Sequence, residues 1–129
     1  MKASSCTLVL EEVEHWLTLV RRDLDSARAL LALMRNDHAA FFAQQAAEKT
    51  LKAALTSVQV KAPRSHDLAR LTDLLPPDMR DMLPRELLNP VTTWETLSRY
   101  GPQWTGTPSA SEIEQVLDAV NAYLARRNW

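Results

Sequence analysis

The stretch Phe42-Ala-Gln-Gln-Ala-Ala-Glu-Lys-Thr-Leu-Lys-Ala-Ala-Leu55 decides the fold. It consists mainly of strong helix formers, and its apolar residues recur every three or four positions, as on one face of a helix. This face continues to Val58 and is largely alanine, so a neighbouring helix can approach closely. We therefore expect a helix that begins with Asp37 as its N-cap and ends near Val58, packed in an antiparallel hairpin.

The segment before this helix supplies its neighbour. From about Leu8 to Met34, apolar residues lie three or four positions apart, which is the spacing of one helical face. Because Asn36-Asp37 breaks the pattern, the first helix is expected to end before that pair. Two long antiparallel helices are the predicted scaffold.

Two shorter helices are expected after the hairpin. Ser65 is a suitable N-cap for a third helix, which Pro76-Pro77 would end. A fourth helix is expected from about Arg85 to Ser98. It should be irregular near Pro90, because proline lacks the backbone N–H that a helix interior needs.

A capping-box pattern precedes the last helix. The pattern is present twice, as Ser109 with Glu112 and as Ser111 with Glu114, and either pair can satisfy the first backbone donors of a helix. Basic residues at the end of this segment, from Arg126 on, suit the negative end of the helix dipole.

The composition agrees with one domain over residues 1–129. The chain is 46% hydrophobic and 24% charged and contains only two glycines, which favours helix. We expect an all-α fold, a four- to five-helix up-and-down bundle with two long antiparallel helices. The glycines are too few for a Gly-rich phosphate loop, and the single Cys6 excludes an internal disulfide. No cofactor is expected.

The net charge of −1 gives no global attraction for nucleic acid or a membrane surface. Glu11 and Glu12 follow the short apolar run at Leu8 to Leu10, so there is no signal-peptide core, and no apolar stretch is long enough to span a bilayer. We expect a cytoplasmic protein that makes no membrane contact.

One face of the second helix is polar. Gln45, Glu48, Lys49 and Lys52 lie three or four positions apart, and Glu48 precedes Lys52 in the favourable order for an ion pair. Basic residues are concentrated between positions 49 and 70, where Asp67 is the only acid beside Lys49, Lys52, Lys61, Arg64 and Arg70.

His66 lies within this basic segment, in the first turn of the expected third helix. Free backbone N–H groups and the helix dipole favour an anion at such a position. Two interpretations remain open from the residues alone: a solvated polar face, or a surface that contacts phosphate or a nucleotide.

At Gln45–Leu55, Ser65-His-Asp-Leu68 and Arg99-Tyr100, the sequence resembles the HEPN domain, a family named for nucleotide binding in higher eukaryotes and prokaryotes. The similarity extends from about Trp16 to Leu124. It implies a helical bundle that forms a homodimer.

The resemblance also implies partners and ligands. Prokaryotic members often accompany a minimal nucleotidyltransferase, and several such pairs act as toxin and antitoxin, the HEPN member cutting RNA without a metal. Other members bind nucleotides. On this basis, the residues expected to hold a nucleotide or RNA are Gln45, Lys49, Lys52, Arg64, His66, Arg99 and Tyr100.

By this resemblance, the nuclease branch of the family relies on an arginine separated by four to six residues from a following histidine. None of His15, His38 and His66 has an arginine at that spacing. The sequence therefore favours a binding or partner module. A metal-independent ribonuclease is the alternative, and it would need a non-standard pair such as Arg99 with His66.

A third interpretation comes from Glu12-Val-Glu-His15, a Glu-x-x-His of the kind that di-iron helical bundles place inward. Such a site needs a second Glu-x-x-His, and neither His38 nor His66 has a glutamate three positions before it. No metal site is expected.

Overall fold

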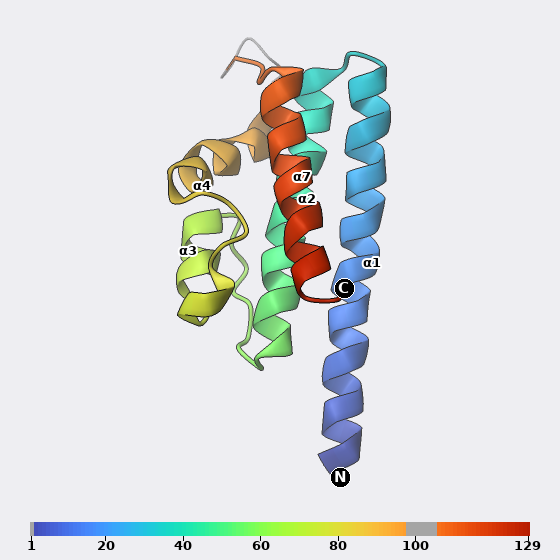
Figure 1. Ribbon diagram of the computed structural model, residues 1–129, viewed down its shortest axis with the longest axis vertical. Helices are drawn as coiled ribbons and strands as arrows, with labels where there is room; N and C mark the ends of the chain where they lie inside the picture. The colour runs from blue at the N-terminus through green and yellow to red at the C-terminus, as the bar shows by residue number, and fades with distance from the viewer. Residues whose placement is uncertain (1, 98–105) are drawn as a thin grey trace.

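The structure, a computed structural model, describes residues 2–97 and 106–129, with side chains from residue 6 on. Within these ranges it is all-helical, with five α-helices, two short 3-10 helices and no strand (Figure 1). The elements are α1 (Lys2–Ala32), α2 (Asn36–Ser57), α3 (Leu68–Asp73), η1 (Pro77–Met79), α4 (Arg85–Thr92), η2 (Thr93–Thr96) and α7 (Ala110–Arg126). The predicted all-α class is confirmed.

The two long helices α1 and α2 form the predicted antiparallel hairpin, and α2 is the centre of the molecule (Figure 1). It packs against α1 on one side and also against α7, α3 and η2. Its alanines are therefore buried on several sides, and seven of them have no exposed surface: Ala39, Ala40, Ala43, Ala46, Ala47, Ala53 and Ala54. Small side chains let several helices approach one central helix at once.

The ends of the hairpin differ from the prediction. Helix α1 begins at Lys2, earlier than expected, because no proline or glycine interrupts its first turns, and it ends at Ala32. Asp37 is not the N-cap of α2. That position belongs to Arg35, whose side chain makes no capping bond, and Asp37 lies in the first turn, where its carboxylate still suits the helix dipole.

The start of α3 also corrects a prediction. Asp67, not Ser65, is its N-cap, because the Asp67 carboxylate accepts hydrogen bonds from the N–H groups of Ala69 and Arg70 at 3.0 and 3.3 Å. The Ser65 hydroxyl instead accepts from the N–H of Asp67 at 3.1 Å. His66 consequently lies in the loop before the helix and not in its first turn.

The fourth helical region matches the prediction up to Leu97, and Ser98 lies outside the described residues. Helix α4 begins after Pro84, contains Pro90, and passes directly into η2. The change to 3-10 geometry shortly after Pro90 is the expected irregularity.

Between the two capping boxes that the sequence offered, the structure selects Ser109 with Glu112. The Ser109 hydroxyl accepts from the N–H of Glu112, and the Glu112 carboxylate accepts from the N–H of Ser109, both at 3.1 Å. At the other end of α7, the buried Tyr123 hydroxyl donates to the Met79 carbonyl at 2.9 Å, which ties α7 to η1. None of the described helices is apolar over a length that could cross a bilayer.

Candidate functional site

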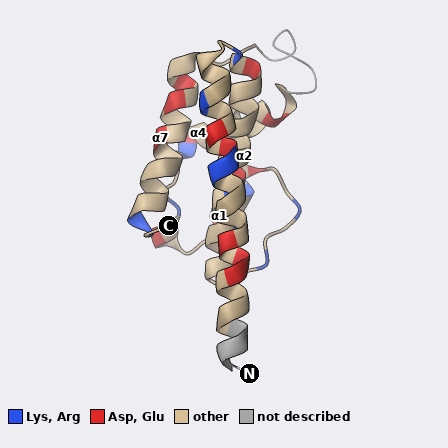
Figure 2. Cartoon of the chain, turned by 90° about the vertical axis from the view of Figure 1, so that its right-hand side faces the viewer, with Lys and Arg blue, Asp and Glu red and all other residues tan. Residues whose placement is uncertain are grey.

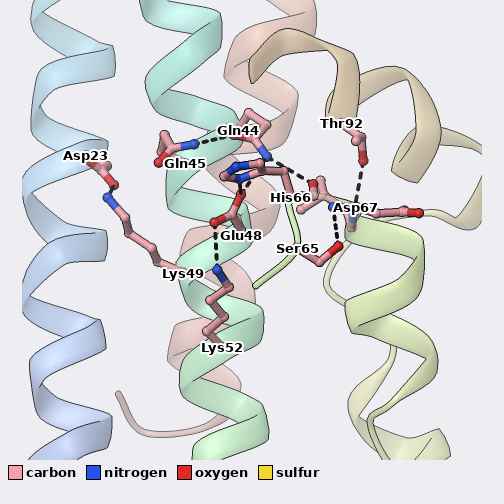
Figure 3. A network of polar contacts seen from close by, with 11 residues as sticks. Asp23, Gln44, Gln45, Glu48, Lys49, Lys52, Ser65, His66, Asp67 and Thr92 are labelled. Carbon is pink, nitrogen blue, oxygen red and sulfur yellow. Dashed lines mark hydrogen bonds and ion pairs between the residues drawn. The ribbon is translucent and has the colours of Figure 1, made fainter. Parts of the chain in front are cut away.

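The polar face of α2 lies between α1 and the loop that leads to α3 (Figure 3). Glu48 is at its centre and is 4% exposed. Its Oε1 lies 2.7 Å from Nδ1 of His66 and accepts from the Gln44 amide at 3.2 Å, while its Oε2 accepts from the Lys52 ammonium at 3.0 Å. A buried carboxylate is costly unless its oxygens are paired. These three partners satisfy it.

His66 belongs to the loop, and its side chain is 58% exposed although its partner Glu48 is buried. Two further contacts hold this loop. The Gln44 amide donates to the His66 carbonyl at 3.4 Å, and the N–H of Leu68 donates to the Thr92 hydroxyl at 3.0 Å. The loop backbone around His66 is thus held from α2 and from α4, and the imidazole itself contacts Glu48 of α2.

The carboxylate determines the histidine tautomer. An ionised Glu48 can only accept, so Nδ1 of His66 is assigned as the N–H that donates to it. In the neutral ring, Nε2 then carries a lone pair. It can accept a hydrogen bond or take up a proton from a bound molecule, and after protonation it can donate one.

Lys49 contacts a second buried carboxylate. Its ammonium donates to Oδ2 of Asp23 on α1 at 2.7 Å (Figure 3). Burial raises the pKa of Asp23, and the hydrogen bond and charge of Lys49 oppose this effect only in part. Both lysines that the sequence proposed as anion ligands are therefore already paired, Lys49 with Asp23 and Lys52 with Glu48.

The other expected ligand-binding residues have different surroundings. Gln45 is half-buried, and its side-chain amide donates to the side-chain Oε1 of Gln44 at 2.7 Å. Arg64 is exposed on the loop, two residues before His66. Arg99 and Tyr100 lie outside the described residues, so the assignment of these two stays a prediction.

The sequence pattern pointed to Glu48 only as an ion-pair partner of Lys52, and it did not point to Asp23. Asp23 did leave a signal, because it falls among Val20, Leu24 and Ala27 on the apolar face of α1, where a carboxylate needs a partner. No comparable signal linked Glu48 to His66.

The Glu12-x-x-His15 motif lies on the exposed side of α1. Among residues 2–97 and 106–129, no three His, Cys, Asp or Glu side chains gather in a way that could hold a metal ion. The described geometry therefore offers no support for the di-iron interpretation.

Fold and site together define a small helical bundle whose central helix has one polar face, with a loop histidine held against that face. The chain belongs to the HEPN domain family, whose model matches residues 13–125.

Two solved structures are similar to it. The protein TT1696 from Thermus thermophilus is 29% identical with a TM-score of 0.69, over 88% of this chain and 93% of that one. ST0689, an archaeal HEPN homologue, is 25% identical with a TM-score of 0.64, over 88% of this chain and 92% of that one. No curated protein matches the chain.

Proposed function

We propose that this HEPN protein binds a nucleotide or an RNA segment at the polar face of α2, with His66 as the central contact. The observation that supports this most is the exposed imidazole held 2.7 Å from a buried carboxylate. Such a ring presents one directional hydrogen-bonding atom, Nε2, at a fixed place on the surface. Phosphate oxygens and base edges are suitable partners for it.

The charges on this face decide which cations are available to contact a phosphate. The net charge of each ion pair, Asp23–Lys49 and Glu48–Lys52, is zero, so these lysines add little free positive charge. The cations assigned to phosphate are therefore Arg64, on the His66 loop, and Arg99. Lys49, Lys52 and Gln45 shape the surface, and Tyr100 is proposed as a neighbouring contact.

Titration of mononucleotides and a short single-stranded RNA against wild type and His66→Gln tests the proposal. We expect His66→Gln to weaken binding about tenfold, since it removes a hydrogen bond to a charged group. Arg64→Gln should weaken binding and reduce its salt dependence. His38→Gln is the matched control, because His38 is also exposed. Equal affinity of wild type and His66→Gln would refute the assignment.

A second candidate function is metal-independent RNA cleavage, and the Glu48–His66 hydrogen bond favours it specifically. A carboxylate-oriented imidazole is a suitable general base. Nε2 of His66 would accept the proton of a ribose 2′-hydroxyl as its oxygen attacks the adjacent phosphorus and the 5′-oxygen leaves. Arg99 would contact the phosphate in this arrangement.

This second function predicts that purified protein cleaves RNA to 2′,3′-cyclic phosphate ends and that His66→Ala removes the activity. Growth arrest on expression would follow from the same chemistry. Glu48→Gln should reduce the rate more than it reduces RNA affinity, because it disturbs the orientation of the base. RNA that stays intact after prolonged incubation would eliminate this candidate.

The partner assignments also stay proposals: a homodimer in the cytoplasm, and a minimal nucleotidyltransferase as the second protein of a toxin–antitoxin type pair. They are supported by membership of the family and not by a contact in this chain. Identification of the neighbouring gene, followed by co-purification of its product and measurement of the mass of the complex, tests them together.

A further inference from the structure

A cavity of about 490 Å³ lies beside the site, between the N-terminal half of α1 and the segment that follows α2. Its volume is that of a small-molecule site. Val9, Trp16 and Val60 supply apolar walls, and Glu12, Gln59 and Lys61 supply polar groups. Figure 2 shows the acidic positions in this part of α1 and the basic positions along the neighbouring loop.

Trp16 gives this cavity an aromatic wall. Its indole N–H is buried and has no hydrogen-bond acceptor among the described residues, which makes tryptophan a costly choice for packing alone. The ring also lies 5.8 Å from the Lys52 ammonium. A large flat indole beside a cavity suits stacking with another flat ring.

The polar groups of the cavity match one edge pattern. Glu12 is exposed, and its carboxylate makes no hydrogen bond or ion pair with another part of the described chain, so it can accept from ring N–H and amino donors. Lys61 can donate to ring nitrogen or carbonyl acceptors. Guanine fits this pair best, because its N1–H and N2–H donors lie side by side for one carboxylate and its O6 and N7 acceptors lie together for an ammonium. Adenine has a single amino group between two acceptor nitrogens, so it cannot offer a carboxylate two adjacent donors.

The cavity continues the face that carries His66. Glu48, Lys52 and Thr56 follow one another at single-turn spacing on α2, and Thr56 lines the cavity. Two turns of helix separate Glu48 from Thr56, about 12 Å along the axis. A single nucleotide in an extended form spans such a separation. Lys52 links the two ends, because it bonds Glu48 and lies over Trp16.

We propose that this cavity is a nucleobase subsite selective for guanine, with Trp16 as the stacking wall and Glu12 and Lys61 as the groups that read the base edge. The inference deepens the proposed function and rests on it, since the base would occupy the cavity while the phosphate reaches His66. Glu12 is then the residue that determines the specificity for guanine.

The test is titration of guanosine, adenosine and GMP into the protein, followed by isothermal calorimetry and by NMR of the tryptophan indole N–H signals. Guanosine carries no phosphate, so it reports on the cavity alone. We expect it to bind at least tenfold more tightly than adenosine, and Glu12→Gln to remove about that factor. Val9→Trp, which fills the cavity from α1, should abolish guanosine binding.

Each variant has a neighbour as its control. Glu11→Gln and Leu10→Trp lie one residue away on the exposed side of α1, and they should change guanosine affinity less than about twofold. His66→Gln should leave the affinity for guanosine unchanged and weaken the binding of GMP.

The affinities for guanosine and GMP separate the subsite from the proposed function. GMP binding that is insensitive to the base and to Val9→Trp would overturn the subsite and leave the proposed function standing. Guanosine binding with GMP affinity insensitive to His66→Gln would support the subsite and refute His66 as the phosphate contact of the proposed function. Failure of both ligands to bind would overturn both.

Discussion

Asp23 on α1 and Glu48 on α2 are two buried carboxylates that each contact a lysine, yet their surroundings differ. Asp23 and Lys49 form a closed pair that joins two helices. Glu48 shares its two oxygens among Lys52, Gln44 and His66, and the last of these presents a ring nitrogen to solvent. The difference separates an ion pair that only joins two helices from one that also positions an exposed imidazole.

The largest expected effect is that of Glu48→Ala. It leaves the Lys52 ammonium, whose side chain is 13% exposed, without its carboxylate. Breaking such a buried pair from one side costs about 3 kcal/mol of unfolding free energy. Urea denaturation measures this, with the exposed Glu114→Ala on α7 as control. A loss under about 1 kcal/mol would remove the distinction between the two carboxylates.

Asp23→Asn should cost less, about 1 kcal/mol, because the asparagine oxygen can still accept a hydrogen bond from Lys49. Burial already opposes the ionised form of Asp23, and Lys49, whose side chain is 21% exposed, can turn toward water when its partner becomes neutral. A double-mutant cycle with Lys49→Met isolates the pair. If Asp23→Asn proves as costly as Glu48→Ala, the Asp23 pair is the stronger structural element of the two.

The pH dependence of stability gives a smaller effect with a definite sign. Because burial raises the folded-state pKa of Asp23, the folded protein holds this proton more tightly than the unfolded chain does. The stabilising contribution of Asp23 is therefore complete below its unfolded pKa and is lost as pH rises through the raised folded pKa. Wild type should lose stability relative to Asp23→Asn across that interval. An opposite slope in paired urea titrations would contradict the assignment.

The smallest expected effect on stability is that of His66→Gln. The ring is mostly exposed, and Gln44 and Lys52 still donate to Glu48. We expect a change within about 0.5 kcal/mol, as at ordinary surface positions. Thermal unfolding measures it beside the binding assay. A large destabilisation would mean that the histidine serves the fold.

Much of the fold could be predicted from the sequence because its patterns are local. The hairpin follows from periodicity, and the capping box of α7 follows from two residues three positions apart. The caps at Arg35 and Asp67 were missed because several polar residues compete at each helix start, and geometry chooses among them. That α2 is covered on several sides was also missed, since an alanine seam shows only that helices approach closely.

The candidate site was predictable only where its residues are neighbours on one helix. The Glu48–Lys52 pair followed from its four-residue spacing. The contacts of Lys49 with Asp23 and of Glu48 with His66 join residues 26 and 18 positions apart. These contacts depend on how α1 and the α2–α3 loop fold against α2, and no local sequence pattern predicts which distant residues then meet.

The alanine-lined centre of α2 also limits how this domain can evolve. A buried alanine can be exchanged for glycine, which weakens the helix, or for a larger residue, which must push a neighbouring helix away. Ala43 and Ala47 are fully buried in the turns before Glu48 and Lys49. A larger side chain at either position would disturb the packing that positions the carboxylates of Asp23 and Glu48. We expect natural variants to keep these alanines more strictly than the charged residues of the loop, which an alignment of related chains can check.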